Sequence, residues 1–185
     1  MRSRGPAGGG VVANCSPSSL ATIEAMLGAL LAELGYFCID PSLPPQQKIE
    51  LLSAAAPGTL RDEYIKNGGL LKFAATVETR GPAGVAALYA TSGSAGEPKI
   101  VALSHRAIMF DIGRQTNDLF LGPDDRLDSL FSCAFSASLA TIFGALLNGA
   151  ELHCYDPRRN VSTFPAWLRE HRITVSSMTV SMLRH

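Results

Sequence analysis

The feature that most constrains the fold is an alternation of helix-length and strand-length apolar segments. Between residues 20 and 34, apolar side chains recur at helical spacing, with Ser18 or Ser19 as the expected N-cap and Gly35 as the expected helix end. The strand-length segment YFCI follows directly. Because alternation of this kind requires crossover connections, we predict an α/β fold with a mainly parallel sheet layered with helices.

The same alternation continues to the end of the chain. A second helix is predicted to place Ile49, Leu52 and Ala56 on one face, and residues 57–84 carry turn signals with at most a short strand near residues 70–75. The other expected elements, in chain order, are strands at 85–88 and 100–103, a helix at 106–120, a strand at 127–132, a helix at 137–147 with Gly149 past its end, a strand at 151–155, a helix capped by Ser162 or Thr163, and a strand at 173–178.

Composition limits the partners of the chain. Its 185 residues are 46% hydrophobic and 17% charged, which is typical of a globular domain with a buried core. Sixteen basic and sixteen acidic residues cancel, so no general field favours nucleic acid or an anionic membrane, and we expect a small-molecule partner. The four cysteines lie far apart, which indicates neither a zinc site nor a disulfide framework, and we expect four buried, reduced thiols.

Two segments bear on targeting. The first ten residues, MRSRGPAGGG, have no apolar stretch behind their arginines, so residues 1–10 are interpreted as a flexible lead and not as a secretory signal. Residues 129–150 carry no charge over the length of a membrane span, but several hydroxyl and amide side chains interrupt them. A buried strand and helix fit this stretch better. We therefore expect no membrane span and a soluble, cytoplasmic protein.

The segment TSGSAGEPK, residues 91–99, lies between two apolar runs and is expected to be a loop between two buried strands. Gly93 and Gly96 permit backbone angles that let consecutive amide N–H groups face a common anion. Hydroxyl donors and one cation surround these glycines, at Thr91, Ser92, Ser94 and Lys99. The composition favours a phosphate-binding loop, and the alternative is an ordinary glycine-rich hairpin turn.

Two familiar kinds of phosphate loop do not fit this segment. A Walker loop needs glycine before its lysine and Ser or Thr after it, where Pro98 and Ile100 stand. A dinucleotide-binding fingerprint fails as well, because no glycine stands at position 95. A phosphate loop of a different kind remains.

The stretch YATSGSAGEPKIVALSH resembles the phosphate-loop signature of the adenylate-forming enzymes, which include acyl-CoA synthetases, luciferases and the adenylation domains of nonribosomal peptide synthetases. Three further segments are similar to that superfamily in the right order. They are LATIEAMLGALLAELGYFCIDPSLP, LGPDDRLDSLFSCAFSASLATIFGALLNGAELHCYDP and AWLREHRITVSSMTVSMLR. The resemblance covers nearly everything from residue 11 to 185, except residues 57–84, and implies a partial AMP-binding domain over residues 11–185.

The resemblance implies an ATP-dependent ligase with Mg²⁺ as cofactor, which joins a carboxylic acid to AMP and transfers the acyl group to coenzyme A or a carrier-protein thiol. Charge grows on the departing pyrophosphate, and a loop of N–H groups, hydroxyls and a lysine would stabilise it. The residues that match the family loop, and that we assign to the ATP phosphates, are Thr91, Ser92, Gly93, Ser94, Gly96 and Lys99.

Two positions depart from the family pattern. Ala95 stands where the family usually has threonine, which removes one phosphate contact. Phe135 and Ser136 align with a substrate-pocket motif whose second residue is aspartate in members that activate amino acids. Because Ser136 carries no charge, we expect an acyl, aryl or hydroxy acid, or a pocket without selectivity; the alternative is that both residues pack in the core. His105 is interpreted as structural, since adenylation needs no general base.

By the same comparison the chain is expected to be a fragment. The family's catalytic lysine, its adenine- and ribose-binding segments and its acidic metal ligand match nothing in this sequence, so we expect the isolated chain to be inactive. Two hypotheses follow. The chain is either part of an AMP-forming ligase that acts together with its missing half, or a non-catalytic remnant or interaction module that retains the fold core.

Overall fold

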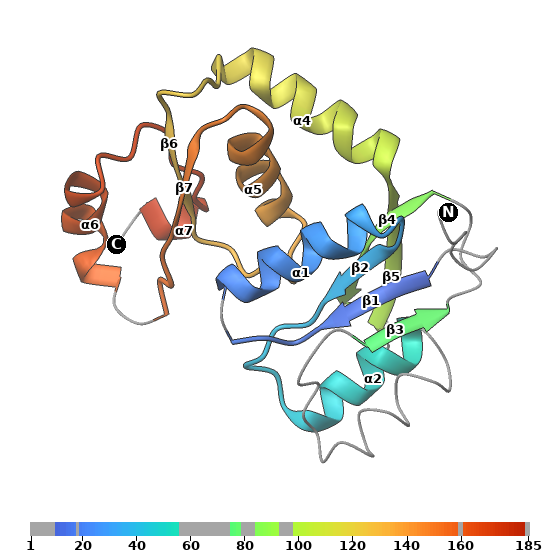
Figure 1. Cartoon of the computed structure of the whole chain (residues 1–185). Helices are drawn as coiled ribbons and strands as arrows, with labels where there is room; N and C mark the ends of the chain where they lie inside the picture. The colour runs from blue at the N-terminus through green and yellow to red at the C-terminus, as the bar shows by residue number, and fades with distance from the viewer. Residues whose placement is uncertain are drawn as a thin grey trace. The chain divides into compact units, whose positions relative to one another are not determined.

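The computed structural model describes residues 10–17, 19–55, 75–78, 84–92, 98–158 and 161–183. The chain divides into two compact units, residues 1–108 and 109–185 (Figure 1). The lead predicted for residues 1–10 lies outside the described residues, apart from Gly10, which begins the first strand. Each unit is described by itself.

The first unit contains a five-stranded sheet in the order β3-β1-β2-β4-β5 (Figure 1). Its strands are β1 (Gly10–Asn14), β2 (Gly35–Cys38), β3 (Ala75–Glu78), β4 (Val85–Ser92) and β5 (Pro98–Ser104). β2 runs parallel to β1 and β4, whereas β3 and β5 add antiparallel edges. With the parallel pair of the second unit, parallel pairings predominate among the described strands, and the predicted α/β class with a parallel-rich sheet is confirmed.

Two helices cover opposite faces of this sheet, α1 (Ser19–Leu31) and α2 (Pro45–Ala55) (Figure 1). Leu52 of α2 is fully buried against Val11 and Phe37, as its predicted place on the apolar face requires. α1 packs against β1 and β2 and buries Ile23 and Met26. Both faces of β2 are consequently covered, which explains why all four of its residues are buried and apolar or glycine.

The apolar face predicted for α1 is partly wrong. Leu20 and Leu31 belong to the predicted stripe but are 66% and 87% exposed. The buried residues of α1 are Thr22, Ile23, Met26 and Ala29. Small side chains at two of these positions allow the helix to approach the sheet closely, so the burial of this helix follows side-chain size as well as apolar periodicity.

Gly35 is not the helix end that the sequence predicts. α1 ends earlier in a left-handed turn, where Glu33 has φ 62° and the Leu34 N–H donates to the Ala29 carbonyl at 2.9 Å. Gly35 instead begins β2, and a Cβ placed there would lie 3.0 Å from the carbonyl oxygen of Val85 and 3.3 Å from Cγ2 of Val11. Glycine is needed here because three strands approach each other closely.

The two strands predicted around the glycine-rich segment are present, but one is not buried. β4 is buried from Ala86 to Tyr89, whereas Val101 of β5 is 43% exposed. Among the described strands β5 pairs only with β4, so its other edge faces away from the sheet. A short strand, β3, lies at Ala75–Glu78 and overlaps the span predicted near residues 70–75 at residue 75, and residues 70–74 lie outside the described residues.

The second unit is built on a parallel pair, β6 (Arg126–Ser129) and β7 (Glu151–Cys154), which α5 (Ala137–Leu147) connects. The other helices are α4 (His105–Leu119), whose first residues belong to the first unit, the 3₁₀ turn Val161–Thr163, α6 (Phe164–Glu170) and α7 (Val180–Leu183). Leu121, Leu127 and Ala145 form a core with Leu152 and Val175. α5 has the predicted bounds, Asn148 is its C-cap, and Gly149 follows with φ 72°.

The strand predicted at residues 173–178 is wrong. Only Val175 forms a bridge there, parallel to Leu127 of β6. Backbone hydrogen bonds join Thr174 and Val175 to Arg126 and Asp128, and beyond Val175 a hydroxyl side chain binds an aspartate of β6 instead. The segment therefore follows β6 without becoming a full strand.

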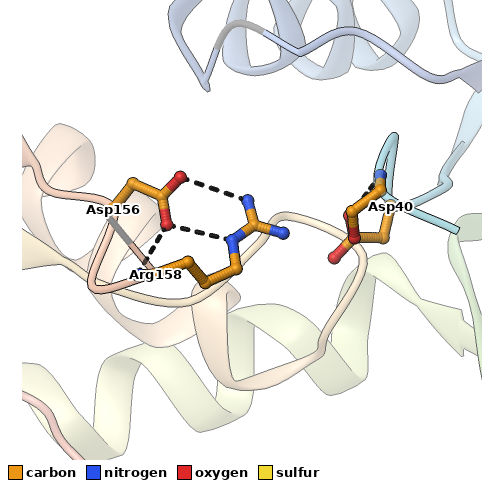
Figure 2. Close-up of polar contacts among 4 residues, drawn as sticks. Asp40, Asp156 and Arg158 are labelled. Carbon is orange, nitrogen blue, oxygen red and sulfur yellow. Dashed lines mark hydrogen bonds and ion pairs between the residues drawn. The ribbon is translucent and has the colours of Figure 1, made fainter. Parts of the chain in front are cut away.

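Each unit contains an Asp-Pro turn after a strand (Figure 2). After β2, Asp40 accepts hydrogen bonds from the N–H and the hydroxyl of Ser42, at 2.9 and 2.6 Å. After β7, Asp156 accepts from the backbone N–H and Nε of Arg158, both at 3.0 Å. Aspartate side chains bonded two residues ahead are typical of such turns, and they direct the chain away from the strand end.

The expectation of four buried thiols holds for only two of them. All four cysteines are free; Cys38 and Cys133 are buried, Cys15 is half-buried and Cys154 is exposed at the end of β7. Burial, with a smaller contribution from the neighbouring Cys154, raises the pKa of Cys133 to about 11. Among the described residues no helix is both long and apolar enough to cross a bilayer.

Candidate functional site

The predicted phosphate loop connects β4 and β5, which form an antiparallel hairpin. Thr91 pairs with Lys99, and Ser92 pairs with Pro98, at the end of the hairpin next to the connecting loop. Gly93, Ser94 and Gly96 lie outside the described residues, as does Ala95. The structure therefore fixes the two ends of the loop and brings its first hydroxyl residue opposite its lysine.

Thr91 and Lys99 are both exposed. Residues directly opposite each other in an antiparallel pair project their side chains from the same face of the sheet. The Thr91 hydroxyl also donates to the Lys99 carbonyl oxygen at 3.4 Å. A lysine and a threonine that project from the same face at the end of a hairpin can together bind an anion such as phosphate.

The two residues assigned to the acid lie between β6 and α5. Phe135 is 57% exposed, so it does not pack in the core, and Ser136 is exposed at the helix N-cap without a side-chain capping bond. Their backbone is nevertheless fixed: the Phe135 N–H donates to the Ser132 carbonyl at 2.9 Å, and the buried Ser138 hydroxyl donates to the Phe135 carbonyl at 2.7 Å. An aromatic ring and a hydroxyl are thus presented on an ordered turn.

His105, interpreted from the sequence as structural, begins α4 and has an exposed side chain. Its backbone N–H donates to the Gly84 carbonyl at 3.3 Å, and the neighbouring Ser104 hydroxyl accepts from the Ala107 N–H at 3.2 Å. The second contact is a helix N-cap. Both contacts hold the start of the helix.

Sequence reasoning missed a buried carboxylate on β6. Asp128 is fully buried, and burial raises its pKa, while hydrogen bonds from Ser176 and Ser177 partly offset that effect. Three residues earlier in the sequence, Asp125 accepts hydrogen bonds from the Thr174 hydroxyl at 2.7 Å and from the Gly122 N–H at 2.9 Å. These bonds lower the pKa of Asp125. The sequence signal was an aspartate inside an apolar strand-length run.

Among the residues that the structure describes, no group of three or more His, Cys, Asp or Glu side chains lies close enough together to hold a metal ion. Magnesium is usually held by one or two carboxylates together with the phosphates of its substrate.

The sequence matches the model of the AMP-binding enzyme family over residues 47–185, which is well over half of the chain. The chain belongs to the AMP-binding enzyme family. This match includes the hairpin of β4 and β5, the turn before α5 and the whole second unit of the fold.

Individual relatives agree with this membership of the AMP-binding family. The chain is 30% identical to nonribosomal peptide synthetase kk1B of Curvularia clavata over 94% of its own length, and 33% identical to cyclosporin synthetase simA of Tolypocladium inflatum over 79%. These alignments cover 2% and 1% of the two synthetases. The chain thus corresponds to a small part of each of these proteins.

Solved structures share the fold at lower identity. The o-succinylbenzoate CoA synthetase of Bacillus subtilis, in complex with ATP and magnesium, matches 96% of this chain and 41% of its own with a TM-score of 0.74 and 18% identity. The N-terminal subdomain of Klebsiella oxytoca NpsA, in complex with 3-hydroxybenzoyl-AMSN, matches 91% and 47% with a TM-score of 0.67 and 23% identity. This chain therefore spans less than half the length of these two structures.

Proposed function

We propose that this chain supplies the phosphate-binding hairpin and the acid-binding turn of an AMP-forming ligase. This ligase would activate a carboxylic acid as an acyl-adenylate and transfer it to a thiol, either coenzyme A or carrier-protein pantetheine. Membership of the AMP-binding family supports the reaction class. The observation that carries the proposal is the pairing of Thr91 with Lys99, both exposed, at the loop end of the hairpin.

In this reaction a carboxylate attacks the α-phosphorus of ATP, the bond to the bridging oxygen breaks, and pyrophosphate leaves with the bonding electrons. The Lys99 ammonium group and the Thr91 hydroxyl would stabilise the β- and γ-phosphates, where negative charge increases as the bond breaks. Ser92, Gly93, Ser94 and Gly96 would add hydroxyl and backbone donors. ATP and Mg²⁺ are the implied cofactors, and because ATP is the second substrate we place the reaction in the cytoplasm.

Phe135 and Ser136 would form one wall of the acid pocket. An exposed aromatic ring favours an apolar or aryl acid, and the Ser136 hydroxyl can donate to the substrate carboxylate or accept from a hydroxy acid. Neither side chain carries a charge that would hold an α-ammonium group. We therefore propose an acid without an α-amino group as substrate.

Binding to the purified chain tests both halves of this proposal without requiring turnover. In amide NMR titrations, inorganic tripolyphosphate should shift the Thr91, Ser92 and Lys99 signals, and carboxylates such as benzoate, octanoate and lactate should shift those of Phe135 and Ser136. Lys99→Ala should weaken the binding of tripolyphosphate about three- to tenfold and leave carboxylate binding unchanged. Lys48→Ala, which removes a lysine whose ammonium group binds the Pro41 carbonyl, is the charge-matched control.

Ser136→Asp tests the acid pocket. The aspartate side chain should repel carboxylate ligands that lack an amino group and so weaken their binding. It should leave tripolyphosphate binding unchanged. If Ser136→Asp alters tripolyphosphate binding while Lys99→Ala alters carboxylate binding, the two roles are assigned wrongly. If the wild-type chain binds neither probe at the named residues, the chain is better explained as a non-catalytic remnant or interaction module.

A further inference from the structure

The segment after Val175 is held beside β6 by one carboxylate. Backbone pairing with β6 ends at Val175, which forms a bridge with Leu127 and accepts a hydrogen bond from the Asp128 N–H at 3.3 Å. Beyond it, the Ser176 hydroxyl donates to Oδ2 of Asp128, and the Ser177 N–H donates to Oδ1 of the same carboxylate at 3.1 Å. Asp128 therefore replaces the backbone ladder at the point where that ladder stops.

The topology places this contact at the same sheet edge as the acid-binding turn. The bridge is parallel, so residues 174–177 run in the direction of β6, and both segments leave the sheet at the carboxyl end of that strand. The chain after β6 leads to Phe135 and Ser136, and the chain after Ser177 leads to Met178 and Thr179. In open α/β sheets, ligands bind at the carboxyl ends of the strands.

Asp128 lies on the face of β6 opposite α5. Leu127 and Leu152 pack in the core that includes Ala145 of α5, and side chains alternate along a strand, so Asp128 projects to the other face. It is fully buried there, although Ser176 is exposed. A buried carboxylate is costly unless it is hydrogen-bonded, and both oxygens of Asp128 accept hydrogen bonds from Ser176 and Ser177. The carboxylate thus fixes the place of these two residues beside β6.

We propose that Asp128 is a positioning residue of the acid pocket: by binding Ser176 and Ser177 it holds residues 176–179 at the sheet edge where Phe135 and Ser136 meet the acid. This inference rests on the proposed function. Asp128 itself does not touch the acid; its effect passes through the backbone of residues 176–179. It contributes to acid binding and not to phosphate binding.

Three variants separate positioning from a merely structural role. Asp128→Leu removes both hydrogen bonds and places a larger side chain at a fully buried position, so its urea midpoint should fall below that of the wild type. In the folded chain it should weaken the binding of benzoate, octanoate or lactate about tenfold and accelerate hydrogen exchange at the Ser177 amide. Asp128→Asn can still accept from the Ser177 N–H and bond the Ser176 hydroxyl, so it should bind carboxylates like the wild type. Tripolyphosphate binding should be unchanged in both variants.

Ser176→Ala provides the third variant, because it removes an exposed hydroxyl and keeps the buried carboxylate. It should weaken carboxylate binding less than Asp128→Leu does. A chain with both substitutions should bind carboxylates with the same affinity as Asp128→Leu alone. If Asp128→Leu fails to fold, Ser176→Ala alone decides the question: wild-type carboxylate affinity in a folded Ser176→Ala chain would overturn the inference.

The outcomes also separate this inference from the proposed function. If the wild type binds carboxylates and Asp128→Leu binds them equally well, the inference is overturned and the proposed function stands. A wild-type chain that binds tripolyphosphate but no carboxylate overturns the acid half of the proposed function and the inference with it. If carboxylate affinity and the urea midpoint of unfolding fall in the same order across all three variants, Asp128 has only a structural role, and this result also overturns the inference.

Discussion

The clearest test of the first unit is Gly35→Ala, because the structure specifies what the added methyl group would meet. The new Cβ would lie 3.0 Å from the backbone carbonyl oxygen of Val85 and 3.3 Å from Cγ2 of Val11, whereas ordinary contacts begin at 3.4 Å. A backbone atom in a central strand cannot rotate away, so β2 must shift by a few tenths of an ångström between β1 and β4. Overpacking of this kind costs about 1–3 kcal/mol.

Urea unfolding followed by far-ultraviolet circular dichroism measures this cost. A loss of 2 kcal/mol would lower the midpoint by about 1 M, for a typical slope of about 2 kcal/mol per molar urea. Gly28→Ala is the matched control, because Gly28 lies inside α1 and nothing is within 4 Å of the added Cβ. Helix propensity should make that variant about 0.5–1 kcal/mol more stable. A Gly35→Ala chain as stable as Gly28→Ala would refute the close approach of the three strands.

Two further predictions concern ionisable groups of the second unit. Burial raises the pKa of Asp128, so the wild type should lose stability relative to Asp128→Asn as pH rises through that raised pKa. Hydrogen bonds lower the pKa of Asp125, so the wild type should lose stability relative to Asp125→Asn as pH falls through that lowered pKa. Urea unfolding followed by Trp167 fluorescence, between about pH 3 and pH 7, measures both pH dependences. Because burial raises the pKa of Cys133 to about 11, iodoacetamide at about pH 8 should label it far more slowly in the folded chain than in urea, and equal labelling rates by mass spectrometry would contradict its burial.

Much of the local structure was determined by the sequence itself. The bounds of α5 and the glycine after it follow from apolar periodicity and from the backbone freedom of Gly149, which are properties of neighbouring residues. The hairpin of β4 and β5 was predictable because two apolar runs flank a segment of turn-forming residues. The residues of that segment also indicated the AMP-binding family, since Lys99 and the hydroxyl residues of the loop are close in sequence.

Tertiary structure decided the features that depend on distant residues. Gly35 ends no helix, because its role is set by Val85 and Val11 on neighbouring strands, and no local pattern encodes that contact. Leu20 and Leu31 fit a helical stripe but are exposed, because the sheet contacts the arc of α1 where small residues allow close approach.

Asp128 shows the same limit at the candidate site. Its partners, Ser176 and Ser177, lie 48 and 49 residues away in sequence, so only the folded chain brings the carboxylate and its donors together. The segment that contains them has the β-branched composition of a strand, but hydroxyl-to-carboxylate bonds there compete with the backbone ladder. Periodicity reports which side chains share a face, whereas burial and hydrogen bonding depend on what the rest of the chain places against that face.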